Sequence, residues 1–255
     1  MLGKIKLKIT SGQTNLPPLQ HVGRPGIEEF LSTDGQLLLQ LARESEIRFG
    51  PAFYKAAIYA GDGILRLDFD NRRFFSYGGQ GQRFHRQSSP WSPSSSCVVL
   101  LELLSRNAAP GAKISRIVFF DVEHQVPLAG WDFDSLISHK MWNSLGNLYL
   151  FRDIRELYLF SAKDRRLNSV TASSSPHCFF LKDEFVCVVE VTGEIAVFDA
   201  ISGARVATDD VSEAGYAVKE VYPDENQSCI SVILKSRSDH DAPEVTYNVT
   251  VARGN

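Results

Sequence analysis

Residues 184–208 read EFVCVVEVTGEIAVFDAISGARVAT, and this stretch indicates the fold of the chain. Two apolar runs, Glu184–Val191 and Glu194–Asp199, flank Thr192-Gly193, which is the composition of a compact β-hairpin. The second run ends at Asp199 and is followed by a glycine-containing turn and a third apolar run. We therefore predict three consecutive antiparallel strands here.

The same order of strand, polar residue, turn and strand recurs along the chain. It appears in ILRLDFDNRRFFSY from Ile64, IVFFDVEHQVPLAGW from Ile117 and LYLFSAKDRRLNSV from Leu157. The aligned polar residues are Asp68, Asp121, Ser161 and Asp199. Because the position recurs, we expect its side chain to cap the turn by accepting local backbone N–H groups. A period of about 40–50 residues with four strands per unit is typical of a β-propeller blade.

These repeats predict an all-β, propeller-like array of about five four-stranded blades with few helices, formed by residues 1–255 as a single domain. One blade cannot bury both of its faces, whereas blades packed radially bury each other and leave only short edges. Asp132–Trp142 is the best candidate for a helix, because its apolar residues recur at helical spacing. A β-sandwich of irregular hairpins is the alternative fold.

The stretch IAVFDAISGARVAT, which starts at Ile195, resembles the outer strands of blades in WD-repeat propellers. The resemblance extends loosely over residues 28–252. The only Trp-Asp dipeptide, Trp131-Asp132, falls outside the aligned position, and Gly-His pairs are absent. A propeller must close its ring, often by adding an N-terminal strand to the last blade. Lys4–Thr10, within residues 1–11, has the alternating pattern of such a strand.

Composition limits the classes of protein to which the chain can belong. Of its 255 residues 44% are hydrophobic, which argues against intrinsic disorder, and a pI near 6.1 argues against a nucleic-acid partner. No apolar run approaches the ~18 residues of a membrane-spanning helix, and no secretory signal is recognisable. The four cysteines, which we expect to be reduced and buried, are Cys97, Cys178, Cys187 and Cys229. We therefore expect a cytoplasmic protein without a membrane partner.

No catalytic or metal-binding motif is present in the sequence. The six histidines show neither HExxH nor HxH spacing, no cysteine pair has CxxC spacing, and no GxSxG elbow occurs. The one local cluster of titratable residues, Asp239-His240-Asp241, is expected to be a solvated turn. We predict a protein without enzymatic activity, cofactor or metal. The alternative is a propeller hydrolase or lyase with acidic residues on separate blades.

A long polar loop, residues 78–96 with Tyr77 directly before it, is the second-ranked of two candidate contact surfaces. Its glycine-rich start lacks the Lys-Ser/Thr of a phosphate-binding loop. The segment is rich in aromatic and arginine residues, which dominate binding hot spots. The candidate partner-binding residues here are Tyr77, Arg83, Arg86 and Trp91.

The leading candidate surface is acidic. Between Asp183 and Glu225 there are 11 acidic residues, opposed only by Arg205 and Lys219. The best candidates for contact with a basic partner are Asp209, Asp210, Glu213, Asp224 and Glu225. Asp183, Glu184 and Glu194 follow because they flank hairpin turns. Such a surface attracts a cationic partner and speeds encounter.

Together these features predict a non-enzymatic protein-binding module, a monomer that forms a 1:1 complex with a basic protein. Standalone, divergent propeller-like chains with acidic faces look like immunity proteins. That analogy implies a cytosolic inhibitor that neutralises an antibacterial toxin effector, such as a nuclease of the kind delivered by type VI secretion. The alternative is a WD-repeat-like scaffold subunit of a complex. No direct contact with nucleic acid is expected.

Overall fold

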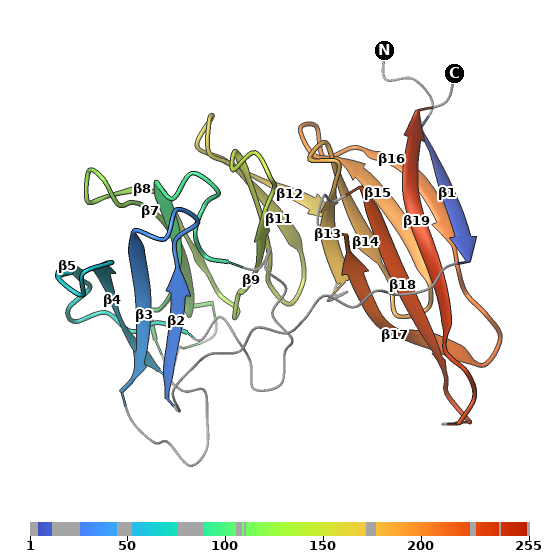
Figure 1. The fold of residues 1–255 in the computed structure, drawn as a ribbon, viewed down its shortest axis with the longest axis horizontal. Helices are drawn as coiled ribbons and strands as arrows, with labels where there is room; N and C mark the ends of the chain where they lie inside the picture. Colours follow the sequence, from blue (N-terminus) through green and yellow to red (C-terminus); the bar gives the residue numbers. More distant parts are fainter. Residues whose placement is uncertain are drawn as a thin grey trace. The chain divides into compact units, whose positions relative to one another are not determined.

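The computed structural model describes residues 5–11, 26–44, 53–75, 89–105, 109, 111–171, 177–224, 228–239 and 241–253. Within these ranges the chain forms nineteen strands and no helix, so the all-β prediction is confirmed (Figure 1). No helix in the described ranges is long and apolar enough to cross a membrane. The chain divides into two compact units, residues 1–16, 155–159 and 167–255 (unit 1) and residues 17–154 and 160–166 (unit 2).

The strands form five antiparallel sheets, four of them built only from strands that follow one another in the chain and the fifth from three such strands and the N-terminal strand. Sheet I contains β2 (Ile27–Leu31), β3 (Leu37–Arg43), β4 (Tyr54–Ala60) and β5 (Leu65–Asp68). Sheet II contains β6 (Cys97–Leu103), β7 (Ser115–Asp121) and β8 (Val126–Phe133). Sheet III contains β9 (Ser138–Trp142), β10 (Leu148–Arg152), β11 (Leu157–Ser161) and β12 (Arg166–Thr171).

Sheets IV and V belong to unit 1. Sheet IV contains β13 (His177–Leu181), β14 (Phe185–Val189), β15 (Glu194–Asp199) and β16 (Arg205–Asp210). Sheet V contains β17 (Tyr216–Pro223), β18 (Cys229–Ser236), β19 (Val245–Arg253) and the N-terminal strand β1 (Ile5–Ser11). The radial arrangement of sheets that a propeller requires stays a prediction.

The core consists of central strands that are apolar on both faces. Every residue of β14, with the sequence FVCVV, is buried, as are the first six residues of β6. In unit 2, aromatic rings join sheets II and III, since Phe119 of β7 stacks on Phe160 of β11 with ring centroids 3.8 Å apart. Tyr149 of β10 meets the same Phe119 ring edge-on at 5.3 Å. Strands buried on both faces explain why the sequence shows continuous apolar runs rather than strict alternation.

Four of the five sheets share one capped turn before a strand that begins with a buried or half-buried apolar residue. A side-chain oxygen accepts a hydrogen bond from the backbone N–H five residues later, with donor–acceptor distances of 2.9–3.1 Å. The pairs are Ser32 with Leu37, Ser92 with Cys97, Asn143 with Leu148, and Asp224 with Cys229. The sequence alignment above did not include this second repeat. Its signal is a Ser, Asn or Asp five residues before an apolar strand.

A different turn recurs after the third strand, where the polar residue of the sequence repeat caps it. In sheet II an isolated bridge from Trp91 to Val98 takes the place of a first strand, so β7 stands third, like β11 and β15. The capping oxygens of Asp121, Ser161 and Asp199 accept backbone N–H groups three residues on, at 3.0, 3.3 and 2.7 Å respectively. Four residues after each cap the backbone is left-handed, at Gln125, Arg165 and Gly203 (φ of 57°, 52° and 70°). The capping prediction is confirmed at these three positions.

Asp68 does not belong to this set. It ends β5, the fourth strand of sheet I, so the sequence alignment is wrong there. The sequence repeat predicts a strand after Asp68, but the described part of that segment forms only a bridge. In it Phe74 pairs with Tyr54 of β4 and with Glu102 of β6. Phe74 therefore joins sheets I and II instead of completing a hairpin.

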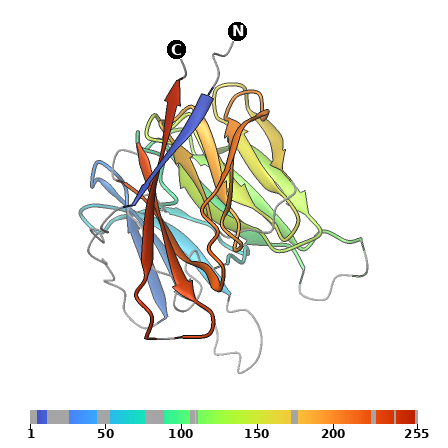
Figure 2. The same ribbon diagram turned by 90° about the vertical axis from the view of Figure 1, so that its right-hand side faces the viewer.

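The N-terminal strand completes the sheet that holds the C-terminal strands. β1 pairs antiparallel with β19, from Ile5 opposite Arg253 to Ser11 opposite Tyr247 (Figure 2). This is the pairing that the sequence analysis expected of the residue 1–11 segment. Closure of a ring by this strand stays a prediction.

The prediction of a helix at Asp132–Trp142 is wrong. β8 continues to Phe133, a bend follows, and β9 begins at Ser138. Ser135 holds the bend, because its hydroxyl donates to Asp153 at 2.9 Å and its carbonyl accepts the Ser115 hydroxyl at 2.5 Å. The helix-like spacing arises because a strand end buries Phe133, the segment after the bend buries Ile137 and a new strand buries Met141 and Trp142.

All four cysteines are free, and three of them are buried. Burial raises the pKa of the Cys97 and Cys187 thiols to about 12. Cys229 is half-buried, and burial also raises the pKa of its thiol. The expectation of reduced strand cysteines is met, with Cys229 less enclosed than expected.

Candidate functional site

The acidic segment of the sequence is divided between two ends of sheet IV. Asp183 and Glu184 lie in the β13–β14 turn, whereas Glu190 and Glu194 flank the β14–β15 turn. The five residues of β14 carry the chain from one end of the sheet to the other, and a strand advances ~3.3 Å per residue. Acidic residues that are close in sequence are therefore roughly 17 Å or more apart along the strand direction.

One group of acidic residues gathers where the β14–β15 turn meets the end of β16. We call this group the acidic edge; it consists of Glu190, Glu194, Asp209, Asp210 and Glu213. In the β15–β16 register Glu194 lies opposite Asp210, and Ile195 lies opposite Asp209. The Val211 N–H donates to the Gly193 carbonyl at 3.1 Å, which fixes the turn against the chain that leaves β16.

Local hydrogen bonds hold the carboxylates of the acidic edge in place. Asp210 accepts the Ser212 N–H at 2.6 Å and the Ser212 hydroxyl at 2.9 Å. Glu213 accepts a hydrogen bond from the Tyr247 hydroxyl of β19, and this bond raises the pKa of the phenol. Glu194, Asp209 and Asp210 are exposed. The edge thus presents fixed negative charge to solvent, which favours encounter with a cationic surface.

The two cations of this stretch of sequence do not offset the acidic edge. Lys219 forms an ion pair with Glu244 at 2.7 Å. Arg205 begins β16 at the opposite end of the strand from Asp209 and Asp210. Between the two ends of sheet IV, the acidic edge is the more strongly acidic one, and it also exposes Val191, at 49% of its surface.

Among the described residues, the other acidic candidates, Asp183, Glu184 and Asp224, lie away from this edge. Asp183 and Glu184 lie at the other end of sheet IV, where the Ala200 N–H donates to the Glu184 carbonyl at 2.8 Å. Asp224 caps the β17–β18 turn, since its side chain accepts the N–H groups of Ser228 and Cys229. We interpret Asp224 as structural.

The prediction that Trp91 contacts a partner protein is wrong. Its side chain is only 2% exposed, and its indole N–H donates to the Phe30 carbonyl at 2.8 Å. The described end of the 78–96 loop, residues 89–96, forms a bridge and a capped turn, so Trp91 is a core residue and not a partner contact. Tyr77, Arg83, Arg86 and Glu225 lie outside the described residues.

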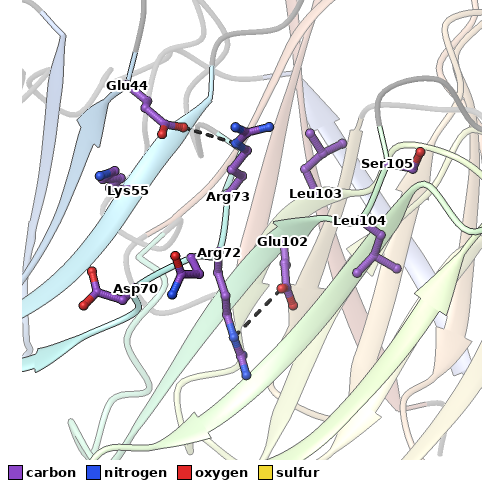
Figure 3. Close-up of a pocket in the computed structure, with 10 residues that line it drawn as sticks. Glu44, Lys55, Asp70, Arg72, Arg73, Glu102, Leu103, Leu104 and Ser105 are labelled. Atoms are coloured by element: carbon purple, nitrogen blue, oxygen red, sulfur yellow. Dashed lines mark ion pairs between the residues drawn. The ribbon is translucent and has the colours of Figure 1, made fainter.

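A second candidate site is a charged pocket of about 460 Å³ in unit 2 (Figure 3). We call it the Glu102 pocket. Its lining residues are Glu44, Lys55, Asp70, Asn71, Arg72, Arg73, Glu102, Leu103, Leu104 and Ser105. It was missed in the sequence, although Glu102 gives a signal: it is the one charged residue in the apolar run Cys97–Leu104.

Backbone pairing around Phe74 positions the charged side chains of this pocket. Phe74 bridges β4 and β6, the Leu103 N–H donates to the Arg73 carbonyl at 2.7 Å, and the Phe75 N–H donates to the Leu101 carbonyl at 2.8 Å. Arg72 and Arg73 therefore run alongside the end of β6 that carries Glu102. In Figure 3 the side chains of Arg72 and Glu102 point toward one another.

Glu102 is buried, with 9% of its surface exposed. Its carboxylate lies 4.0 Å from Arg72 Nε and 3.9 Å from Arg116, distances that allow charge attraction but no hydrogen bond. Its Oε2 atom is enclosed and has no hydrogen-bond partner among the residues that the structure describes. A buried carboxylate oxygen without a donor is unfavourable, so Glu102 is the most unusual polar group of the pocket.

Two neighbouring arginines, Arg116 and Arg73, form ion pairs with carboxylates other than Glu102 at shorter distances. Arg116 makes a bidentate pair with Asp132 at 2.5 and 3.0 Å, which raises the pKa of the arginine and lowers that of the aspartate. Arg73 pairs with Glu44 at 3.3 Å. Among the described residues, the Arg72 guanidinium forms an ion pair with Glu102 alone, and its side chain is 44% exposed.

Among the described residues, no group of three or more His, Cys, Asp and Glu side chains could hold a metal ion. Comparison with protein-family models and with curated proteins finds no match to this chain.

Proposed function

We propose that this protein is a non-catalytic protein-binding module whose acidic edge binds a cationic protein. The observation that carries the proposal is the placement of Glu194, Asp209 and Asp210 as exposed carboxylates around one turn. Local hydrogen bonds hold the Asp209 and Asp210 side chains, so these two lose little side-chain freedom on binding. Exposed Val191 beside them adds an apolar contact.

The scaffold that we propose is a WD-repeat-like propeller of five blades. Three features support it: five sheets of consecutive strands, the two recurring capped turns, and the pairing of β1 with β19. Propellers present their turns on rigid faces, and such faces suit protein recognition.

The more specific proposal is an immunity protein that neutralises a basic antibacterial toxin in the cytoplasm. The fixed negative charge of the acidic edge supports it, because charge attraction favours rapid capture of a cationic partner. A WD-repeat-like scaffold subunit is the alternative, and it would bind several partners of one complex rather than one toxin.

The test compares charge reversal at the two ends of sheet IV. A double variant, Asp209→Lys with Asp210→Lys, alters the acidic edge. A matched double variant, Asp183→Lys with Glu184→Lys, makes the same change in net charge at the opposite end. Partners recovered from the native host with the wild-type chain are then measured against both variants.

The edge variant should lower the association rate of the partner at least about 10-fold at low salt, while the matched variant changes it little. Raising salt should reduce the wild-type rate steeply. In a cell that expresses the recovered toxin, the wild-type chain and the matched variant should restore growth and the edge variant should not. Equal effects of both variants would refute the acidic edge as the binding surface.

A further inference from the structure

Two turns at one end of sheet III lie side by side and form a basic surface, which we call the basic turn pair. It consists of the β9–β10 turn, residues 143–147, and of residues 162–166, which form the β11–β12 turn and the first residue of β12. The Ala162 N–H donates to the Asn147 carbonyl at 2.8 Å, which holds one turn against the other. Both segments belong to unit 2.

The β9–β10 turn presents a leucine to solvent. Leu145 is 72% exposed, although the turn that carries it is fixed on two sides. The buried Asn143 side chain accepts the Asn147 N–H at 3.1 Å. Gly146 packs so closely on residues 89–96 that a Cβ at this glycine would lie 2.9 Å from Pro93 Cδ. Binding at Leu145 therefore does not have to order the backbone around it, which lowers the cost of binding.

The β11–β12 segment places three cations beside this leucine. Lys163, Arg165 and Arg166 are all exposed. The one acidic residue of the segment, Asp164, accepts a hydrogen bond from the Ser161 hydroxyl at 3.0 Å. Three cations against one anion give the segment a net charge of +2. The equivalent turns of sheets II and IV, residues 122–125 and 200–204, contain neither Lys nor Arg.

Arg165 has an unfavourable backbone conformation for its residue type. Its φ of 52° is left-handed, as it is at the equivalent positions Gln125 and Gly203. This conformation favours glycine, so an arginine lowers the stability of the turn. Residues in unfavourable backbone conformations are concentrated at binding and catalytic sites. The Arg165 side chain is thus a candidate for a role in binding.

The spacing of the two turns sets the spacing of the groups that a ligand needs. The turns are centred two strands apart in sheet III, which is about 10 Å at the usual strand separation. An extended chain advances about 3.3 Å per residue, so about three residues cover this distance. A matching ligand has an apolar side chain for Leu145 and carboxylates about three residues away for the cations.

We propose that the basic turn pair binds an acidic segment of another protein, in which an apolar residue lies about three residues from a pair of carboxylates. The apolar residue contacts Leu145, and the carboxylates pair with Lys163, Arg165 and Arg166. The exposed leucine favours a protein segment over a nucleic acid, because a chain of phosphates would leave it without an apolar contact. The surface lies in unit 2 and does not use the acidic edge of unit 1, so either proposal can fail alone.

The first experiment uses the wild-type chain and short fluorescent peptides. Each peptide has one leucine and two glutamates that begin three residues before or after it, in a background of serine and glycine. Fluorescence anisotropy at low salt should give a Kd below about 1 mM for at least one order. Replacing the glutamates with glutamine should weaken binding at least about 10-fold. Replacing the leucine with serine should weaken it at least about 3-fold. A labelled single-stranded oligonucleotide should bind more weakly than the peptide.

The second experiment tests the residues with the same peptide. Lys163→Glu with Arg166→Glu should weaken binding at least about 10-fold. Lys55→Glu with Arg66→Glu, at two exposed cations of sheet I, makes the same change in net charge and should stay within about 2-fold of the wild type. If the first double variant does not fold, Leu145→Ser replaces it, with an expected loss of at least about 3-fold.

Arg165→Gly separates a role in binding from a role in the fold. Because it relieves the left-handed arginine, it should raise the Tm, and yet it should weaken peptide binding at least about 3-fold. A residue that served only the fold would not show opposite effects. The proposal is overturned if no peptide binds, if the glutamine peptide binds as tightly as its parent, or if both double variants have the same effect. Tighter binding of the oligonucleotide than of the peptide would also overturn it and assign the surface to nucleic acid.

Discussion

Replacing Glu102 with leucine should stabilise unit 2. The substitution removes a buried carboxylate whose Oε2 has no donor among the described residues, a cost of about 1–3 kcal/mol. It also removes two ion pairs at 3.9 and 4.0 Å, but their arginines are 40% and 44% exposed, so each is worth only about 0–1 kcal/mol. A leucine continues the apolar run of β6. We therefore expect a net gain of about 1–2 kcal/mol in the free energy of unfolding.

Tryptophan fluorescence in a denaturant titration measures this change. The three tryptophans of the chain, Trp91, Trp131 and Trp142, all belong to unit 2, so their fluorescence reports the unfolding of the unit that carries the substitution. The expected gain corresponds to a rise in Tm of about 2–8 °C for a unit of this size.

A matched variant works in the opposite direction. Arg116→Met leaves Asp132 without its bidentate partner and leaves Glu102 with one cation fewer, so it should destabilise unit 2 by about 1–2 kcal/mol. A loss of more than about 1 kcal/mol in Glu102→Leu would refute the reasoning. It would mean that the carboxylate is a net stabiliser of the junction between sheets I and II.

Three further predictions concern turns and the sheet edge. Arg165 has a left-handed backbone with φ +52°, which favours glycine, so Arg165→Gly should stabilise the chain by about 0.5–1 kcal/mol. Gly203→Arg, at the equivalent position of another turn, should destabilise the chain by a similar amount. Thermal denaturation measures both changes. Gly193→Val should cost more than about 2 kcal/mol, because φ is +106° and a Cβ would lie 2.8 Å from the backbone nitrogen of Ser212; an unchanged midpoint in urea would contradict this. Deleting residues 1–11 should lower the Tm of unit 1 and promote association on size-exclusion chromatography, because β19 becomes an edge; a monomer of full stability would refute the role of β1.

Local patterns predicted the hairpins because those signals are carried by adjacent residues. Thr192-Gly193 lies between β14 and β15 as expected, and Asp34-Gly35 lies between β2 and β3. The same kind of reasoning failed at Asp132–Trp142, where buried residues recur at helical spacing by coincidence of a strand end, a bend and a strand. A cross-sheet hydrogen bond from Ser135 to Asp153 decides that bend, and no local pattern shows it.

Both candidate sites depend on contacts between residues that are far apart in the sequence. A count of charges along the chain assigned Glu184 and Glu190 to one acidic surface, although β14 places them at opposite ends of one sheet. Glu102 stood out only as a charged residue in an apolar run. Its burial beside Arg72 follows from the bridge that Phe74 makes between two sheets, which pairing rules alone do not predict.

The pairing of β1 with β19 has a consequence for the order in which the sheets form. The two strands lie far apart in the chain, with Ile5 opposite Arg253. β1 has no strand to pair with until β19 has been made, and the long stretch of chain between them makes this contact slow to form. Completion of sheet V is therefore a late step in folding. A chain in which β1 and β19 have not yet paired would expose unpaired strand edges, which chaperones would have to shield from aggregation.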